Sequence, residues 1–253
     1  MTPAAPPAAS AGAVADGRRV RWRAHNQGRR LAIVMAAVDV IERQAPGEEL
    51  QLQAVAEAAG VSRTVIYRHF GDRADLDRAV QQHICEEIAT RLVPGLAPDG
   101  TPEEIIHRLI DAFVTWAVEH PTLYRFVDRD PAGWGASPLG EAIAQLAASI
   151  ESLMTGVLRA IGVQLEDDDR AVMDPWIFGL LGAVFAAVRR WLEREVREPS
   201  AQVLASVLAA STWSQVDGMA RRRGLDLPRL PLTEVLVALG TPAPEALDLE
   251  ETA

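Results

Sequence analysis

The chain contains no lysine and only one cysteine among its 253 residues. A single cysteine, Cys85, excludes an intramolecular disulfide and a cysteine-rich metal site. Cys85 lies beside an apolar stripe with helical spacing, so a packed thiol is the simpler interpretation and a redox sensor is the alternative. Without lysine, arginine is the main source of positive charge, and every basic pattern below is an arginine pattern.

Long apolar runs and β-type patterns are also missing. No stretch of 18 apolar residues free of charge appears, so we expect no membrane span. The Ala/Pro-rich N-terminus has no basic region before an apolar block, unlike a secretory signal, and we expect a cytoplasmic protein. Alternating β-branched residues are scarce and aromatics make up 5%, whereas the 49% hydrophobic content supports a core. Abundant Ala and Leu therefore predict an all-α protein.

The net charge of −10 is unusual for a protein that binds nucleic acid. The charge is unevenly distributed, however. Residues 17–80 hold 11 Arg and 8 Asp or Glu, a net charge of +3, which leaves −13 for the rest of the chain. A basic region of this kind is the electrostatic footprint of a nucleic-acid-binding part, and the acidic remainder would stay away from the phosphates.

Residues 55–70 predict two short helices that meet at Gly60. A glycine at the bend allows a left-handed turn without a Cβ clash, and the small Ala56 allows close packing of the second helix. Ser62, just after the bend, is a good N-cap for a new helix. This is the spacing of a helix-turn-helix, whose second helix enters the major groove of DNA.

The residues around this turn resemble the tetracycline-repressor (TetR) family of transcriptional regulators. The match is strong over residues 29–92, and beyond them it rests on the order and length of the helices. The resemblance implies an N-terminal three-helix domain with a helix-turn-helix and a C-terminal helical domain for ligand binding and dimerisation. The residues that carry it are Ala58-Ala59-Gly60-Val61-Ser62, Ile66-Tyr67, His69-Phe70 and the spacing from Arg73 to Leu76.

The second helix of the motif presents residues suited to reading DNA. Arginine can form bidentate bonds to guanine, and Thr or Val can contact a thymine methyl group. The resemblance implies phosphate contacts for Tyr67, His69 and Arg73, although Tyr67 can also be a core residue. The family usually has a Thr or Ser cap where Leu50 and Gln51 stand. The predicted DNA-contacting residues are Arg23, Arg30, Gln51, Ser62, Arg63, Thr64, Val65, Tyr67, Arg68, His69 and Arg73.

Six arginines between residues 18 and 30 precede this motif. One interpretation is an arm that tracks phosphates or enters the minor groove, and the alternative is the solvated start of a helix. Residues 1–17, composed mainly of Ala, Pro and Gly, should be disordered. Gly and Pro after Arg91 indicate a boundary between a DNA-binding domain, residues 18–92, and a helical domain, residues 93–240. An acidic tail, residues 241–253, follows.

The segment from Trp176 to Leu192 is apolar almost all round, which predicts a helix buried on more than one side. It is shorter than a membrane span and is followed by Arg. In the resembled family this helix and the next one pair with their symmetry mates into a four-helix dimer interface, so we expect a homodimer. The predicted interface residues are Leu181, Val184, Val188, Trp191, Leu204, Val207 and Leu208.

The resembled family is usually controlled by a small molecule held in the C-terminal domain. Aromatic residues in this part could each be plain core, but together they suggest a roomy apolar site. The partner would be a small hydrophobic ligand, for instance a fatty-acyl or lipid-derived compound, acting through a two-state movement of the fourth helix. The predicted lining residues are Phe113, Trp116, Tyr124, Phe126, Trp134, Met154, Leu158, Trp176 and Phe178.

Two other classes remain open, an α-helical enzyme with an apolar cavity and a helical dimer that only binds other proteins. No Gly-x-Ser-x-Gly, phosphate-cradling loop or His-Glu-x-x-His is present, and the five His are scattered. The run Asp167-Asp168-Asp169 fits the positive end of a helix better than calcium ligands, because adjacent residues point in different directions. We therefore expect no catalytic residues, no cofactor and no metal, and a double-stranded DNA operator as partner.

Overall fold

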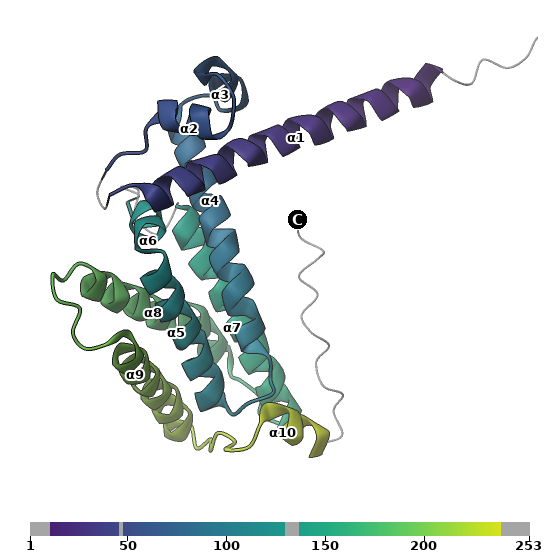
Figure 1. The fold of residues 1–253 in the computed structure, drawn as a ribbon. Helices are drawn as coiled ribbons and strands as arrows, with labels where there is room; N and C mark the ends of the chain where they lie inside the picture. Colours follow the sequence, from purple (N-terminus) through teal and green to yellow (C-terminus); the bar gives the residue numbers. More distant parts are fainter. Residues whose placement is uncertain (1–10, 46–47, 130–136, 239–253) are drawn as a thin grey trace, which may run out of the picture. The chain divides into compact units, whose positions relative to one another are not determined.

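Helices form the regular elements of the computed structural model, which describes residues 11–45, 48–129 and 137–238 (Figure 1). No strand occurs within these residues, and the all-α prediction is confirmed. By internal packing the chain divides into two units, residues 1–80 and 81–253. The division falls inside one helix, earlier than the boundary at residue 92 that the Gly and Pro residues indicate, because a helix can run unbroken from one unit into the next.

The N-terminal unit is a small helical domain whose core is shared by all its helices. Gly60 has a φ of +62°, and the Val61 amide donates to the Ala56 carbonyl at 2.9 Å, which makes the sharp bend that the sequence predicts. Its elements are α1 (Ala11–Arg43), α2 (Leu52–Ala58), α3 (Arg63–His69) and the start of α4 (Arg73–Leu92). Its fully buried side chains include Ile33, Ala37, Val55, Ile66 and Leu76.

Helix α1 is longer than the sequence pattern suggests. It begins at Ala11, so residues 11–17, expected to be disordered, and the basic stretch 18–30 belong to one continuous helix. Ala and Arg are both strong helix formers, which explains how the helix extends beyond its packed part. The packed part begins near Ile33, whereas Leu31 and Met35 remain about half exposed.

The C-terminal unit is a bundle in which α5 packs against α9 and α7 packs against α8. Helix α5 starts with a capping box, in which Thr101 accepts from the Glu104 amide and the Glu104 carboxylate accepts from the Thr101 amide. Ser137 and Ser200 cap α7 and α9 through their side chains. After α4 the elements are the 3₁₀ turn η1 (Val93–Leu96), α5 (Pro102–Glu119), α6 (Pro121–Val127), α7 (Pro138–Ala160), α8 (Asp167–Leu192), α9 (Ala201–Arg222) and α10 (Leu232–Ala238).

Helix α8 extends the apolar run towards the N-terminus by nine residues. It starts at Asp167 and contains Pro175, so its 26 residues correct the expectation of a helix shorter than a membrane span. Among the described helices, α8 is long and apolar enough to cross a membrane, with a mean hydropathy of 1.8 in its most apolar window. Core helices of other proteins pass the same test, and Ile177, Val184 and Val188 of α8 are buried within the chain.

Candidate nucleic-acid interface and apolar cavity

Helix α3 presents a basic, polar face to solvent. Ile66 is 1% exposed and fixes the helix in the core, whereas Arg63, Thr64 and Arg68 are exposed as the sequence predicts. Tyr67 is 48% exposed, which makes its ring available to a partner as well as to its neighbours. Arginine, threonine and tyrosine on one exposed helix face can bond to both phosphates and base edges.

Two residues flank this face at the ends of the motif helices. Ser62 is the N-cap of α3 and Gln51 is the N-cap of α2, and both are exposed. Neither side chain bonds to the first turn of its own helix. Their polar groups, together with the amides of these first turns, are therefore available to a phosphate.

Arg30 of α1 is engaged inside the N-terminal unit. Its Nη1 donates to the His69 carbonyl at 2.5 Å and its Nη2 donates to Asp75 Oδ1 at 3.1 Å. Its guanidinium carbon also lies 4.1 Å from the centre of the Phe70 ring. Arg30 thus joins α1 to the end of α3 and the start of α4, and these contacts hold α3 in place.

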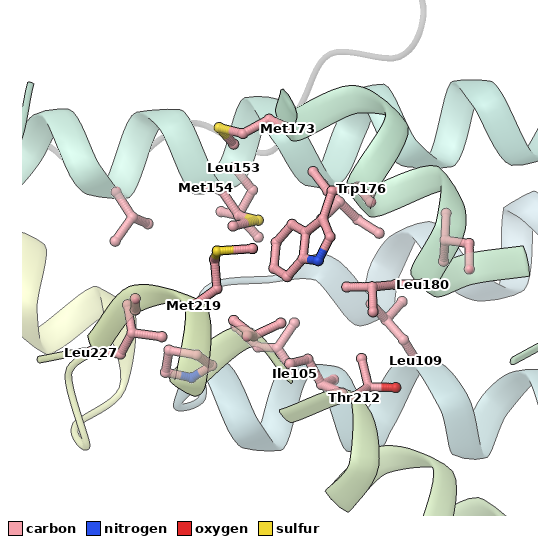
Figure 2. A pocket seen from close by; sticks show the side chains of 18 of the residues that line it. Ile105, Leu109, Leu153, Met154, Met173, Trp176, Leu180, Thr212, Met219 and Leu227 are labelled. Carbon is pink, nitrogen blue, oxygen red and sulfur yellow. The ribbon is translucent and has the colours of Figure 1, made fainter. Parts of the chain in front are cut away.

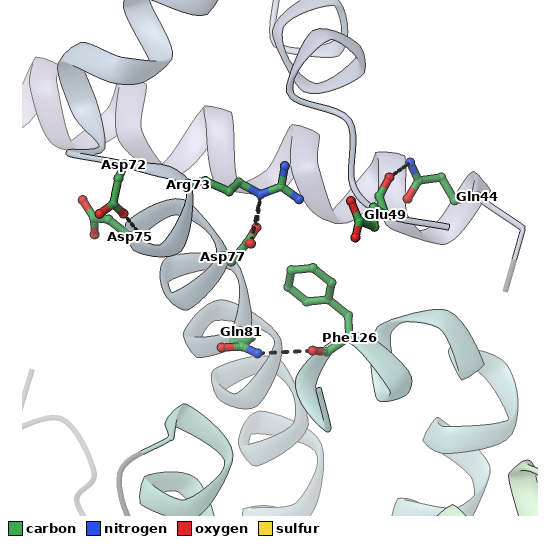
Figure 3. Close-up of polar contacts among 8 residues, drawn as sticks. All are labelled: Gln44, Glu49, Asp72, Arg73, Asp75, Asp77, Gln81 and Phe126. Atoms are coloured by element: carbon green, nitrogen blue, oxygen red, sulfur yellow. Dashed lines mark hydrogen bonds and ion pairs between the residues drawn. The ribbon is translucent and has the colours of Figure 1, made fainter. Parts of the chain in front are cut away.

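The turn between α3 and α4 is closed by carboxylates. Asp72 accepts from the Asp75 amide at 2.8 Å and so caps the first turn of α4 (Figure 3). Asp75 accepts from the Gly71 amide at 3.0 Å, and this bond, followed by the Arg30 bond, lowers the pKa of Asp75. The turn after the recognition helix is therefore held by hydrogen bonds from both sides.

Arg73 of α4 forms an ion pair along its own helix. Its Nε lies 2.7 and 2.9 Å from the two carboxylate oxygens of Asp77 (Figure 3). Both bonds use Nε, which leaves the remaining N–H groups for another acceptor such as a phosphate. Arg23, the other basic residue predicted to contact DNA, lies in helix α1, but its side chain falls outside the described residues.

The C-terminal unit contains a cavity of about 240 Å³ with an almost wholly apolar wall. Side chains enter it from α5, α7, α8 and α9, with Leu227 closing one end (Figure 2). Trp176 of α8 and Met219 of α9 both point into it. Asp169 and Arg223 are the charged residues of the lining, and Thr212 also belongs to it.

The structure separates the nine predicted lining residues into two groups. Four line the cavity, and four lie elsewhere in the bundle; Trp134 lies outside the described residues. Of those elsewhere, Tyr124 donates its hydroxyl to the Phe185 carbonyl at 2.9 Å, and Trp116 is 1% exposed with its ring near His120. The four that line it are Phe113, Met154, Leu158 and Trp176; the four that do not are Trp116, Tyr124, Phe126 and Phe178.

Most of the wall is aliphatic, and the sequence prediction, which named mainly aromatic residues, missed most of it. The missed residues recur three and four positions apart on their helices, which is the available sequence signal, but core residues repeat in the same way. They include Ile105, Leu109, Leu153, Leu180, Val216 and Met219.

The residues predicted for a dimer interface are mostly engaged within the chain. Leu181 and Val184 line the cavity, and Val188 is fully buried. Trp191 is 5% exposed and its indole donates to the Pro199 carbonyl at 2.8 Å. Of the three residues on α9, Leu204 and Leu208 are half-buried, and Val207 is 59% exposed.

The faces of α8 and α9 that remain open carry small and apolar residues. Gly179 and Ala183 are exposed on α8, and Val203 and Ala210 are exposed on α9 together with Val207. Small side chains allow two helices to approach closely. In the described part of the chain no group of three or more His, Cys, Asp or Glu could hold a metal ion.

The comparisons with known proteins agree with this arrangement. Residues 33–80 match the family described as bacterial regulatory proteins, tetR family. The uncharacterized HTH-type transcriptional regulator Rv0472c of Mycobacterium tuberculosis is 25% identical over 83% of this chain and 86% of its own length. A tetR-family transcriptional regulator from Streptomyces coelicolor is 18% identical and has a TM-score of 0.60, over 84% of this chain and 88% of its own.

A further similar structure was solved with a ligand. The transcriptional regulator FadR from Bacillus subtilis, in complex with stearoyl-CoA, has a TM-score of 0.54 and 16% identity over 72% of this chain and 96% of its own. At such identities the two structures show a common fold. The segment that matches the family contains α2, α3 and the start of α4, which form and support the exposed basic face. The chain therefore belongs to the tetR family of bacterial regulatory proteins and is a DNA-binding transcription regulator rather than an enzyme.

Proposed function

We propose that this regulator is a cytoplasmic repressor that binds an inverted-repeat operator as a homodimer and is controlled by a small hydrophobic ligand. The observation that carries the proposal is the combination of an exposed basic helix in one unit with an apolar cavity in the other. Helix α4 links the two features along the chain. It starts four residues after α3 ends, and its last residue, Leu92, lines the cavity.

On DNA, the exposed side of α3 reads the bases. Arg63 and Arg68 suit guanine, and Thr64 and the half-buried Val65 suit the methyl group of thymine. Tyr67 and His69, with Ser62, Gln51 and Arg73 around them, contact phosphates and fix the orientation of the helix. Base contacts give the sequence preference, whereas phosphate contacts give most of the affinity at low salt.

A homodimer is proposed because one such module binds DNA weakly. Two recognition helices read half-sites that lie about 34–36 Å, or a multiple of it, apart on one face of DNA. The open sides of α8 and α9, with Val203 49% and Val207 59% exposed, supply an apolar surface for the partner copy. Self-association of one surface about a two-fold axis gives the symmetry of an inverted repeat.

Ligand control is supported by the chemistry of the cavity. An apolar wall favours an apolar ligand, because removing the apolar surface of the ligand from water is favourable. The FadR structure of Bacillus subtilis, which has the same fold, holds stearoyl-CoA. A ligand that binds two arrangements of the bundle with different affinity would shift α4, and with it the two recognition helices of the dimer.

The test begins with the full-length protein and a pool of fragmented DNA. Rounds of binding and sequencing should enrich fragments that share one inverted repeat, and the isolated repeat should bind the purified protein. Arg63→Ala in the same selection is the matched control, because it removes a base-reading side chain from an exposed position. Enrichment of fragments without two-fold symmetry would reject the proposed dimer–operator arrangement, and absence of enrichment would reject operator binding.

A further inference from the structure

One face of α9 lines the cavity between two polar residues, Thr212 and Arg223. Thr212, Val216, Met219 and Ala220, followed by Arg223 at the C-cap, line it at positions i, i+4, i+7, i+8 and i+11. These spacings place all five side chains on one side of the helix. With a rise of about 1.5 Å per residue, roughly 16 Å separates Thr212 from Arg223. An apolar strip on α9 thus lies between a hydroxyl and a guanidinium.

The guanidinium of Arg223 is paired with Asp169, but its Nη1 contacts only a weak acceptor. Its Nε and Nη2 donate to Asp169 Oδ1, an ion pair that joins the end of α9 to the first turn of α8. Its Nη1 faces the sulfur of Met219 at 2.7 Å. A thioether is a weak acceptor, so the N–H groups of Nη1 have a poor partner for a charged donor.

The guanidinium N–H groups of Arg223 therefore lie where the apolar wall ends. The Arg223 side chain is 37% exposed and that of Asp169 is 22% exposed, which places the pair at the mouth of the cavity. A ligand oxygen that replaces the Met219 sulfur would gain a charge-assisted hydrogen bond, which is stronger than a neutral one. The remaining wall offers hydrocarbon contacts to the rest of the ligand.

We propose that Arg223 anchors the carboxylate of a linear aliphatic ligand whose chain lies along Val216 and Met219, and this proposal rests on the proposed ligand control of the same cavity. Asp169 competes with the ligand carboxylate for the guanidinium, because both are anionic acceptors for the same N–H groups. Asp169 thereby lowers the affinity for the acid and leaves the affinity for an uncharged chain unchanged. The ligand class is a free fatty acid, and its thioester, which lacks the carboxylate, binds less well.

The test measures binding of dodecanoate, 1-dodecanol and dodecanoyl-CoA to the full-length protein by isothermal titration calorimetry. The wild-type protein should bind dodecanoate most tightly. Arg223→Gln should lower the affinity for dodecanoate by at least about tenfold, which is the effect of one charge-assisted hydrogen bond. The affinity for dodecanol should stay unchanged. Arg222→Gln is the matched control, because Arg222 is the exposed neighbour and does not line the cavity.

A second variant separates an anchor from a structural ion pair. Asp169→Asn should tighten dodecanoate binding, since it removes the competing anion, and Asp168→Asn, one residue earlier and exposed, should not. If Arg223→Gln and Asp169→Asn lower the affinity for all three ligands alike, the ion pair has only a structural role and the anchor is rejected. If none of the three ligands binds the wild-type protein, the fatty-acid class is rejected, whereas operator selection tests the proposed regulator independently.

Discussion

Arg30 shows how contacts decide between two roles for a basic residue near DNA. The sequence groups it with the phosphate-contacting arginines, but its guanidinium bonds to His69 and Asp75 and covers the Phe70 ring. A side chain held in this way positions α3, and these bonds restrict it from reaching a DNA phosphate. Its effect on DNA binding should therefore be indirect.

We predict that Arg30→Met weakens operator binding without changing the number of phosphates neutralised. The slope of log K against log salt concentration should stay as in the wild-type protein, whereas loss of a phosphate contact would reduce it by about 1. Fluorescence anisotropy over a series of KCl concentrations measures both quantities. Arg43→Met, an exposed change at the end of α1, is the control, and a reduced slope for Arg30→Met would assign it to phosphate.

Cys85 should be chemically inert in the folded protein. It is 4% exposed, and burial, the largest cause, raises its pKa to about 12, with Glu86 and Glu141 adding to the effect. At about pH 8 the thiol is thus protonated, and the thiolate is the reactive form. Ellman's reagent should label Cys85 only after unfolding in urea. Stoichiometric labelling of the native protein within seconds would support the redox-sensor interpretation instead.

Exposure of single residues was predictable where a local motif sets the direction of a helix. The turn at Gly60 orients α3, so the exposure of Arg63, Thr64 and Arg68 follows from the motif. The cavity residues depend on how four separate helices rotate against one another, and no local pattern in the sequence contains that rotation. Trp116 and Phe178 therefore look like Trp176 in sequence, although only Trp176 lines the cavity.

At the scale of elements, helix α3 is short and depends on its neighbours for its position. It contains seven residues and buries one side chain fully, Ile66, so most of its surface is available for contact. A helix of this length is not stable alone in water. Changes on its exposed face should therefore alter binding with little effect on folding.

Arg63→Ala should weaken specific operator binding by about 1–3 kcal/mol and relax the preference at the base pair it contacts. The thermal unfolding midpoint should stay close to that of the wild-type protein, because Arg63 is exposed. Gel-shift titrations on the selected operator and on single-base variants measure the effect. Unchanged affinity together with unchanged base preference would show that Arg63 does not contact the operator bases.

The limits of the helices were predicted well where a cap or a break marks them. Thr101 and Ser200 mark the starts of α5 and α9, because their side chains accept hydrogen bonds from amides of the first turn. Helix α8 starts at Asp167, which agrees with the expectation that the Asp167-Asp168-Asp169 run lies at the positive end of a helix, and it continues through Pro175 into the apolar segment. The start of α1 was missed because helix propensity continues beyond the packed part of the helix.

At the scale of the whole molecule, the account requires two copies of the chain. The residues predicted for the interface turn out to be largely buried within one copy, which leaves the outer sides of α8 and α9 as the candidate surface. The family resemblance indicated α8 and α9, but the sequence did not separate the side of each helix that faces the chain's own core from the side that faces solvent. Both sides are apolar, so composition alone could not distinguish them.

Val207→Asp should convert a dimer into a monomer and weaken operator binding. Val207 is 59% exposed on α9, and a buried unpaired carboxylate at a contact between two copies is strongly unfavourable. Light scattering at micromolar concentration gives the mass. Val196→Asp, at a 65% exposed position between α8 and α9, is the control, and a wild-type protein that remains monomeric would contradict the proposed dimer.

The central claim is that the basic face around α3 binds DNA through phosphates as well as bases, and the dependence of operator affinity on salt tests it most directly. The account predicts that log K falls linearly as log salt concentration rises, with a slope of about −0.9 for each phosphate neutralised. Full-length protein and the selected operator are sufficient for the measurement. Absence of binding at low salt, or an affinity that does not change with salt, would contradict the claim.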